Sequence, residues 1–163
     1  MHIPDGFFNA GTSLAAGTVA AGGIAVALRR TREVLGERQV PLAALTAAFV
    51  FAAQMLNFPV ASGTSGHLMG GVLAAVLVGP WAAVLCLTVV LGVQALLFAD
   101  GGVTALGLNI VNIALVGGLG GHALYAVLRR RPLRKLLPPQ AAAGLAAFAS
   151  VPLAAAAFTV ELA

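Results

Sequence analysis

The chain has 163 residues, of which 60% are hydrophobic and only 9% are charged, and its mean hydropathy is +1.00. A soluble domain of this length cannot bury so much apolar surface, so the composition predicts a protein embedded in a lipid bilayer. The net charge of +4 comes mainly from two basic clusters beside apolar segments, within residues 29–38 and 129–135. Such clusters are typical of cytoplasmic loops of membrane proteins, and nothing in them requires a nucleic-acid partner.

The first two residues, Met1 and His2, form a candidate metal-binding group. The free α-amine, the backbone nitrogen of His2 and the His2 imidazole can close two fused chelate rings on one metal ion. A planar set of nitrogens favours Ni(II) or Cu(II), and imidazole suits the late first-row metals generally. The hypothesis requires that Met1 is retained, which we expect because its neighbour is bulky and the basic region of a cleavable signal is missing. The alternative is that His2 is an ordinary N-terminal histidine that binds nothing.

Six apolar segments have the length of helices that cross a membrane. They cover approximately residues 9–29, 42–60, 62–79, 81–99, 106–128 and 140–161. Four of these segments lie between the two basic clusters, and this even number places both clusters on the same side, as the positive-inside rule requires. The sequence therefore predicts an all-α, polytopic membrane bundle of about six helices with an inserted N-terminal segment. Its basic loops would be cytoplasmic and its N-terminus outside.

One predicted outer loop, ASGTSGHLMGG at residues 61–71, is unusually small and polar for a lipid-facing element. Irregular backbone at membrane depth is tolerated only where protein or a water-filled cavity surrounds it. His67 lies in this loop, and an ionisable side chain at such a position is functional by default. His67 is therefore a candidate for a fourth nitrogen in the plane begun by Met1 and His2. The alternative is a capped turn followed by a glycine seam for helix packing, which would also bring the N-terminus close to His67.

Two pairs of amides, spaced three residues apart, are expected to face the bundle interior near the outer side: Gln54 with Asn57, and Asn109 with Asn112. Such amides usually bond to neighbouring helices, and the alternative is that they support the imidazoles by accepting a hydrogen bond. His122 lies about 24 Å along the fifth segment, near the inner side, at a rise of about 1.5 Å per residue. We expect it to be a core or helix-end histidine.

The sequence offers little to an enzyme. It contains no phosphate-binding loop, so the chain is not expected to bind ATP. An intramembrane metalloenzyme using the same histidines would need a general base near the metal, for which only Asp5 and Asp100 are available. A purely structural membrane subunit is a third possibility, disfavoured by the polar outer loop. We therefore expect no catalytic residues, and interpret the chain as a transport component.

Several segments together resemble the CbiM/NikM family, the substrate-binding (S) membrane components of energy-coupling factor (ECF) cobalt and nickel transporters. They are MHIPDGF, FVFAAQMLNFPV, SGTSGHLMGG, GPWAAVL and QALLFADGGVTALGLNIVN, which lie within residues 1 to 121. The resemblance implies that Co(II) or Ni(II) is the transported substrate. It also implies four nitrogen ligands: the Met1 amine, the His2 backbone nitrogen, and the imidazoles of His2 and His67.

The resemblance also implies partners and a location. These are a membrane coupling (T) subunit, cytosolic ABC-type ATPase subunits and a small accessory membrane protein, in the inner membrane of a bacterial or archaeal cell. Residues 1–163 would form a single transmembrane domain. Members of the family are similar to seven-helix proteins, so either this sequence is truncated or a final C-terminal helix is missing or supplied by a partner.

Overall fold

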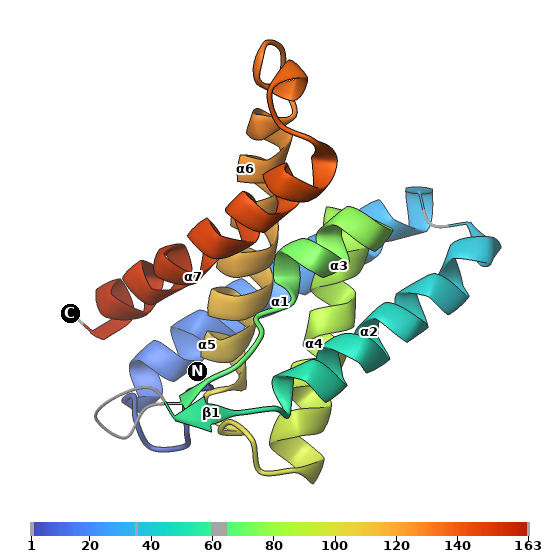
Figure 1. Cartoon of the computed structure of the whole chain (residues 1–163). Helices are drawn as coiled ribbons and strands as arrows, with labels where there is room; N and C mark the ends of the chain where they lie inside the picture. Colours follow the sequence, from blue (N-terminus) through green and yellow to red (C-terminus); the bar gives the residue numbers. More distant parts are fainter. Residues whose placement is uncertain (1, 35, 60–64, 163) are drawn as a thin grey trace.

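The computed structural model describes residues 2–34, 36–59 and 65–162 of the chain. They form a helical bundle, which confirms the predicted fold class (Figure 1). The helices are α1 (Ala10–Val34), α2 (Val40–Gln54), α3 (Gly71–Val78), α4 (Pro80–Leu97), α5 (Leu106–Asn109), α6 (Gly121–Leu128) and α7 (Pro139–Leu162). Two short 3₁₀ turns lie at Glu37–Gln39 and Leu133–Lys135. Two-residue strands, β1 (Phe58–Pro59) and β2 (Ser65–Gly66), pair in antiparallel orientation.

Four helical stretches are long and apolar enough to cross a membrane: Ala10–Val34, Pro80–Leu97, Leu106–Leu128 and Pro139–Leu162. They agree with four of the six predicted segments. The second predicted segment, 42–60, corresponds to the shorter apolar helix Val40–Gln54. It ends at Gln54, several residues before the predicted limit at Pro59.

The prediction of a continuous helix at 62–79 was wrong. Within the described residues the chain is extended up to Gly70, and α3 has only 8 residues. Gly70 precedes the helix with a φ of +74°, a left-handed conformation that a helix interior cannot contain. The direction of the segment is nevertheless as predicted, because the chain runs from β2 to α3 toward the end of the bundle where α4 begins (Figure 1).

The rod formed by residues 106–128 is helical throughout but is not a regular α-helix. Between α5 and α6, residues Ile110–Gly120 form a π-helical stretch. The π-helix is rare and mostly appears as single-turn bulges within α-helices. Gly118 in this stretch lies so close to Gly71 of α3 that a Cβ on Gly71 would come within 2.8 Å of the Gly118 Cα. Glycine is therefore required where α3 crosses the rod.

The main core lies between α1, α2, α4 and the rod. Its buried side chains are Ala20, Ala27, Val50, Val84, Leu87, Leu91, Ile110, Ile113 and Ala114. By contrast, α1 and α7 are mostly exposed, with only 11% and 17% of their most apolar windows buried. Exposed apolar surface of this extent is expected of helices that face lipid.

The two ends of the bundle differ in chemistry. The N-terminal segment, β1 and the connection from α4 to α5 lie at one end, and the connections that follow α1 and α6 lie at the other (Figure 1). The latter connections carry the two basic clusters. Both clusters are thus at the same end, as the count of spans predicted, and the candidate metal-binding residues lie at the opposite end.

Candidate metal-binding site

The N-terminal segment is held by the residues that connect α4 to α5 and by α5 itself. The Ile3 backbone N–H donates to Asn109 Oδ1 at 2.8 Å, and Asn109 Nδ2 donates to the Ile3 carbonyl at 3.1 Å. The same carbonyl accepts a hydrogen bond of 2.8 Å from the backbone N–H of Gly102. An extended segment of the chain is therefore paired with the bundle through its main-chain groups.

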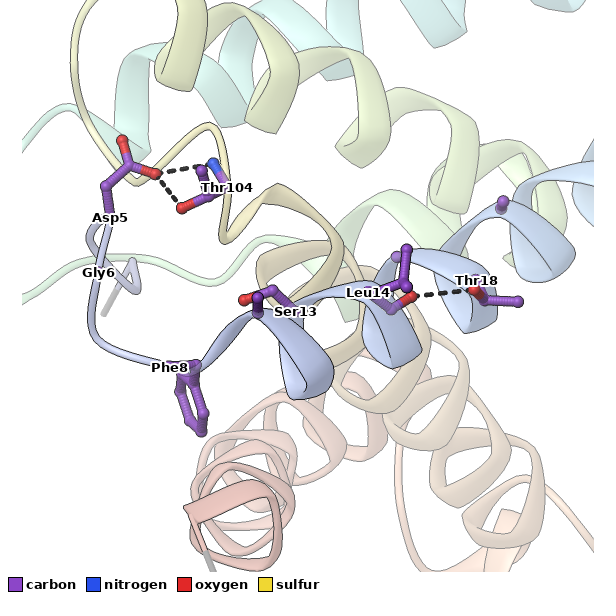
Figure 2. A pocket seen from close by; sticks show the side chains of 10 residues that line it. Asp5, Gly6, Phe8, Ser13, Leu14, Thr18 and Thr104 are labelled. Atoms are coloured by element: carbon purple, nitrogen blue, oxygen red, sulfur yellow. Dashed lines mark hydrogen bonds between the residues drawn. The ribbon is translucent and has the colours of Figure 1, made fainter.

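Asp5 forms a second attachment, a few residues further along. Its Oδ1 accepts hydrogen bonds from the hydroxyl and the backbone N–H of Thr104, the latter at 2.7 Å (Figure 2). These hydrogen bonds lower the pKa of the Asp5 carboxyl, because they favour its ionised form. The contact is therefore fully formed at neutral pH, and is lost only as the pH falls below the ordinary range of a carboxyl.

Ile3 also anchors the segment through its side chain. Its exposed fraction is 4%, and it packs with Ala16, Ala105 and Leu108. Burial of an isoleucine side chain stabilises a structure by about 1.5–3 kcal/mol. The aromatic rings of Phe7 and Phe8 pack against Phe158 of α7, which fixes the turn into α1.

Gly102 has no room for a side chain at this junction. A Cβ there would lie 2.7 Å from the carbonyl carbon of Pro4 and would overlap the backbone nitrogen of Asp5. The close approach allows the N–H of Gly102 to reach the Ile3 carbonyl.

A groove of about 810 Å³ extends from the N-terminal segment along α1. It is lined by residues that include Asp5, Ser13, Thr18 and Thr104 (Figure 2).

This docking brings His2 onto His67. The two imidazole rings are stacked, with their centroids 4.6 Å apart and their planes at 27°. The side chain of His2 is 3% exposed, and His67 is 7% exposed. Two residues that are 65 positions apart in the sequence therefore form one buried pair.

The hydrogen bonds of the two rings define which nitrogens are free. His67 Nδ1 lies 2.9 Å from the Leu68 carbonyl, which can only accept, so Nδ1 carries the proton and Nε2 has a lone pair. Burial lowers the pKa of His67, which keeps its ring neutral at pH 7. His2 Nδ1 lies 2.9 Å from Asp100 Oδ1. The Nε2 atoms of both histidines are buried and have no hydrogen-bond partner among the described residues.

Asp100 was not predicted to contact His2. From the sequence it was expected to end the fourth predicted segment, and to act only in the alternatives of a metalloenzyme base or a carboxylate metal site. Its position before two glycines was the available signal. The carboxylate is 24% exposed at its side chain. Its backbone N–H is bound by the Gln94 carbonyl at 3.1 Å, which fixes the loop to the end of α4.

The predicted amides have different roles. Gln54 is fully buried and donates to the Met69 carbonyl at 2.8 Å, which supports the segment that carries His67. Asn57 is exposed and lies beyond the end of α2, so the prediction that it faces the interior was wrong. Asn109 and Asn112 are both buried. Asn109 holds Ile3, as described above, whereas Asn112 donates to Glu161 of α7 at 2.7 Å.

Two candidate residues from the sequence remain, Met1 and His122. Met1 is outside the described residues. His122 is on α6, beside Tyr125, with the ring centroids 5.9 Å apart, and thus lies away from the His2–His67 pair as expected. In the part of the chain that the structure describes, no three side chains of the types His, Cys, Asp or Glu form a metal-binding group. The hypothesis adds main-chain nitrogens to the two imidazoles.

Comparison with known proteins places the chain in a family. Residues 2–163 match the family model "Cobalt uptake substrate-specific transmembrane region" (CbiM). The chain belongs to the CbiM family. It is 43% identical over 158 residues to a putative metal transport protein of Haloquadratum walsbyi, an alignment that covers 95% of this chain and 68% of that protein. It is 40% identical to the fused nickel transport protein NikMN of Rhodobacter capsulatus, with 99% of this chain and 46% of that protein covered.

Solved structures of transition metal transporters have the same fold as this chain. The crystal structure of a truncated transition metal transporter matches with a TM-score of 0.91 and 34% sequence identity, covering 99% of this chain and 74% of that one. This CbiM-family chain is thus a multi-pass membrane protein whose relatives are transport proteins and not enzymes. It spans less than half of the fused nickel transport protein.

Proposed function

We propose that this chain captures Co(II) or Ni(II) at the end of the bundle where the N-terminal segment is docked. The observation that carries the proposal is the buried pair of His2 and His67, whose rings are 4.6 Å apart. The ligands would be the Met1 amine, the His2 backbone nitrogen, and one imidazole nitrogen from each histidine. Nitrogen donors in a plane suit late first-row metals.

Metal capture requires a local rearrangement of His2. Only Nδ1 of this ring can close a six-membered chelate ring with the His2 backbone nitrogen, and this atom is hydrogen-bonded to Asp100. In addition, a metal lies in the plane of an imidazole that binds it, which two stacked rings do not allow. The His2 ring must therefore leave Asp100 and turn relative to His67 when the metal enters. His67 needs no change of tautomer, since its Nε2 already has a lone pair.

The relatives support the assignment to transport. They include proteins named as nickel transport and cobalt transport proteins. We infer that the chain is the metal-capturing component of an ATP-driven ECF transporter, with a membrane coupling subunit, cytosolic ATPase subunits and a small accessory subunit as partners. The basic end of the bundle would face the cytoplasm of a bacterial or archaeal cell and the histidine pair would face outside. The metalloenzyme alternative has less support, because the Asp5 carboxylate is engaged with Thr104 and the relatives are transport proteins.

The pH dependence of binding tests the nitrogen site. The amine, the backbone nitrogen and the imidazoles must all be deprotonated in the complex, so capture releases protons. Reference pKa values are about 6.5 for histidine and about 7.7–8.0 for an α-amine, so the affinity for Ni(II) should fall steeply between about pH 7.5 and 5.5.

Calorimetry of the purified chain with Ni(II), in buffers of different ionisation enthalpy, measures both the affinity and the number of protons released. A site made of carboxylates would keep its metal down to about pH 5, since Asp and Glu remain ionised there. An affinity that is constant down to pH 5.5, with no proton release, would therefore rule out the proposed ligand set.

A further inference from the structure

Asn109 makes an unusual pair of contacts with the N-terminal segment. Its carboxamide accepts from the Ile3 N–H at 2.8 Å and donates to the Ile3 carbonyl at 3.1 Å, as a neighbouring strand would do. Asn109 is 3% exposed, so both hydrogen bonds are protected from water. Of the described side chains, it is the one that bonds to both main-chain groups of the residue directly after His2.

The position of these contacts matters for metal capture. The peptide group held by Asn109 adjoins His2, whose backbone nitrogen and ring would both bind the metal. The ring has to exchange Asp100 for the metal, and the main chain has to remain beside His67 while it does so. A clamp on Ile3 meets this requirement, because it fixes the backbone without restricting the His2 ring.

We infer that Asn109 is a positioning residue for metal capture, which holds the Ile3 main chain so that the nitrogens of His2 stay beside His67. This inference rests on the proposed function. A free N-terminus carrying the same residues would have to be ordered when the metal binds, and the entropy of ordering would weaken the affinity. Preorganisation by Asn109 removes this cost.

The same rod provides a matched control. Asn112 is also a buried asparagine, one helical turn further along, but it bonds to Glu161 of α7 and not to the N-terminal segment. Loss of either amide removes buried hydrogen bonds from the bundle. Only loss of the Asn109 amide releases the segment that carries His2, so the two variants separate a positioning effect from a general structural one.

The test is a double-mutant cycle on the full chain, with Ni(II) alone as the probe in calorimetry. Wild type, Asn109→Ala and Asn112→Ala are each compared with and without His67→Ala. We expect Asn109→Ala to weaken binding by about 10–100-fold, the range typical of residues that orient metal ligands. In the Asn109→Ala background, His67→Ala should reduce the Ni(II) affinity much less than it does in the wild type, because the chelating N-terminus no longer lies beside His67. Asn112→Ala should leave the affinity within about threefold and keep the full effect of His67→Ala.

Wild-type affinity in Asn109→Ala, or an equal cost of His67→Ala in both backgrounds, would overturn the inference. If Asn109→Ala does not fold, Gly102→Ala displaces the same segment from its other contact, and should give the same loss and the same reduced coupling. Its control is Gly92→Ala, where an added Cβ has no atom within 4 Å. If His67→Ala reduces the affinity of Gly102→Ala as strongly as that of the wild type, the inference is likewise overturned. Insensitivity of wild-type binding to His67→Ala would instead count against the proposed function itself.

Discussion

We expect His2→Ala and His67→Ala each to abolish most of the affinity for Ni(II) and Co(II). The decrease should exceed the roughly 100-fold that loss of an orienting residue causes. Each variant removes a ligand, and His2→Ala also opens a chelate ring. The chain has three histidines, and the third, His122, lies on α6 away from this pair, so no other histidine can replace a lost ligand. Calorimetry and equilibrium dialysis of the purified proteins would measure the loss.

His122→Ala is the matched control for these variants. His122 contacts Tyr125 on α6, close to the basic end of the bundle, and should be replaceable with wild-type metal affinity. A strong loss of binding in His122→Ala, together with unchanged binding in His67→Ala, would contradict both the site and its location.

Acetylation of the N-terminal amine should have an effect of similar size. An acetyl group converts the Met1 amine into an amide, whose nitrogen is a far poorer ligand because it must first lose its proton, and so weakens one chelate ring. Ile3, Asp5 and their partners are unaffected, so the protein should keep its helical content and its thermal unfolding temperature. Equal Ni(II) affinities of the free and acetylated chains, measured by competition with a chromophoric chelator, would exclude the amine as a ligand. A peptide tag fused to the N-terminus should cause the same loss of affinity, and the same tag fused to the C-terminus is its control.

The sequence was sufficient to predict the all-α membrane bundle, because its signals are strong and local. Apolar segments of about 20 residues identify spanning helices by length alone. The two basic clusters, together with the number of spans between them, correctly placed His2 and His67 at the end opposite the basic loops. The pairing of the two histidines thus followed from topology.

The geometry of the site could not be predicted in this way. Helix α3 begins at Gly71 and not near His67, because Gly70 adopts a left-handed conformation that the sequence allows but does not require. The contact between His2 and Asp100 depends on how closely Gly102 approaches the N-terminal segment, which is a tertiary property. Likewise, the spacing of Asn109 and Asn112 indicated a shared buried face, but could not indicate that one amide holds Ile3 and the other Glu161.

The central claim is that the metal is bound by nitrogen atoms of the N-terminus, His2 and His67. Electron paramagnetic resonance of the protein loaded with one equivalent of Cu(II) tests it most directly, because tetragonal nitrogen sites accept this ion and the superhyperfine splitting reports the number of bound nitrogens. The proposed site predicts a tetragonal spectrum with four nitrogens, and with three in His67→Ala. A spectrum dominated by oxygen ligands, or one that His67→Ala leaves unchanged, would contradict the account.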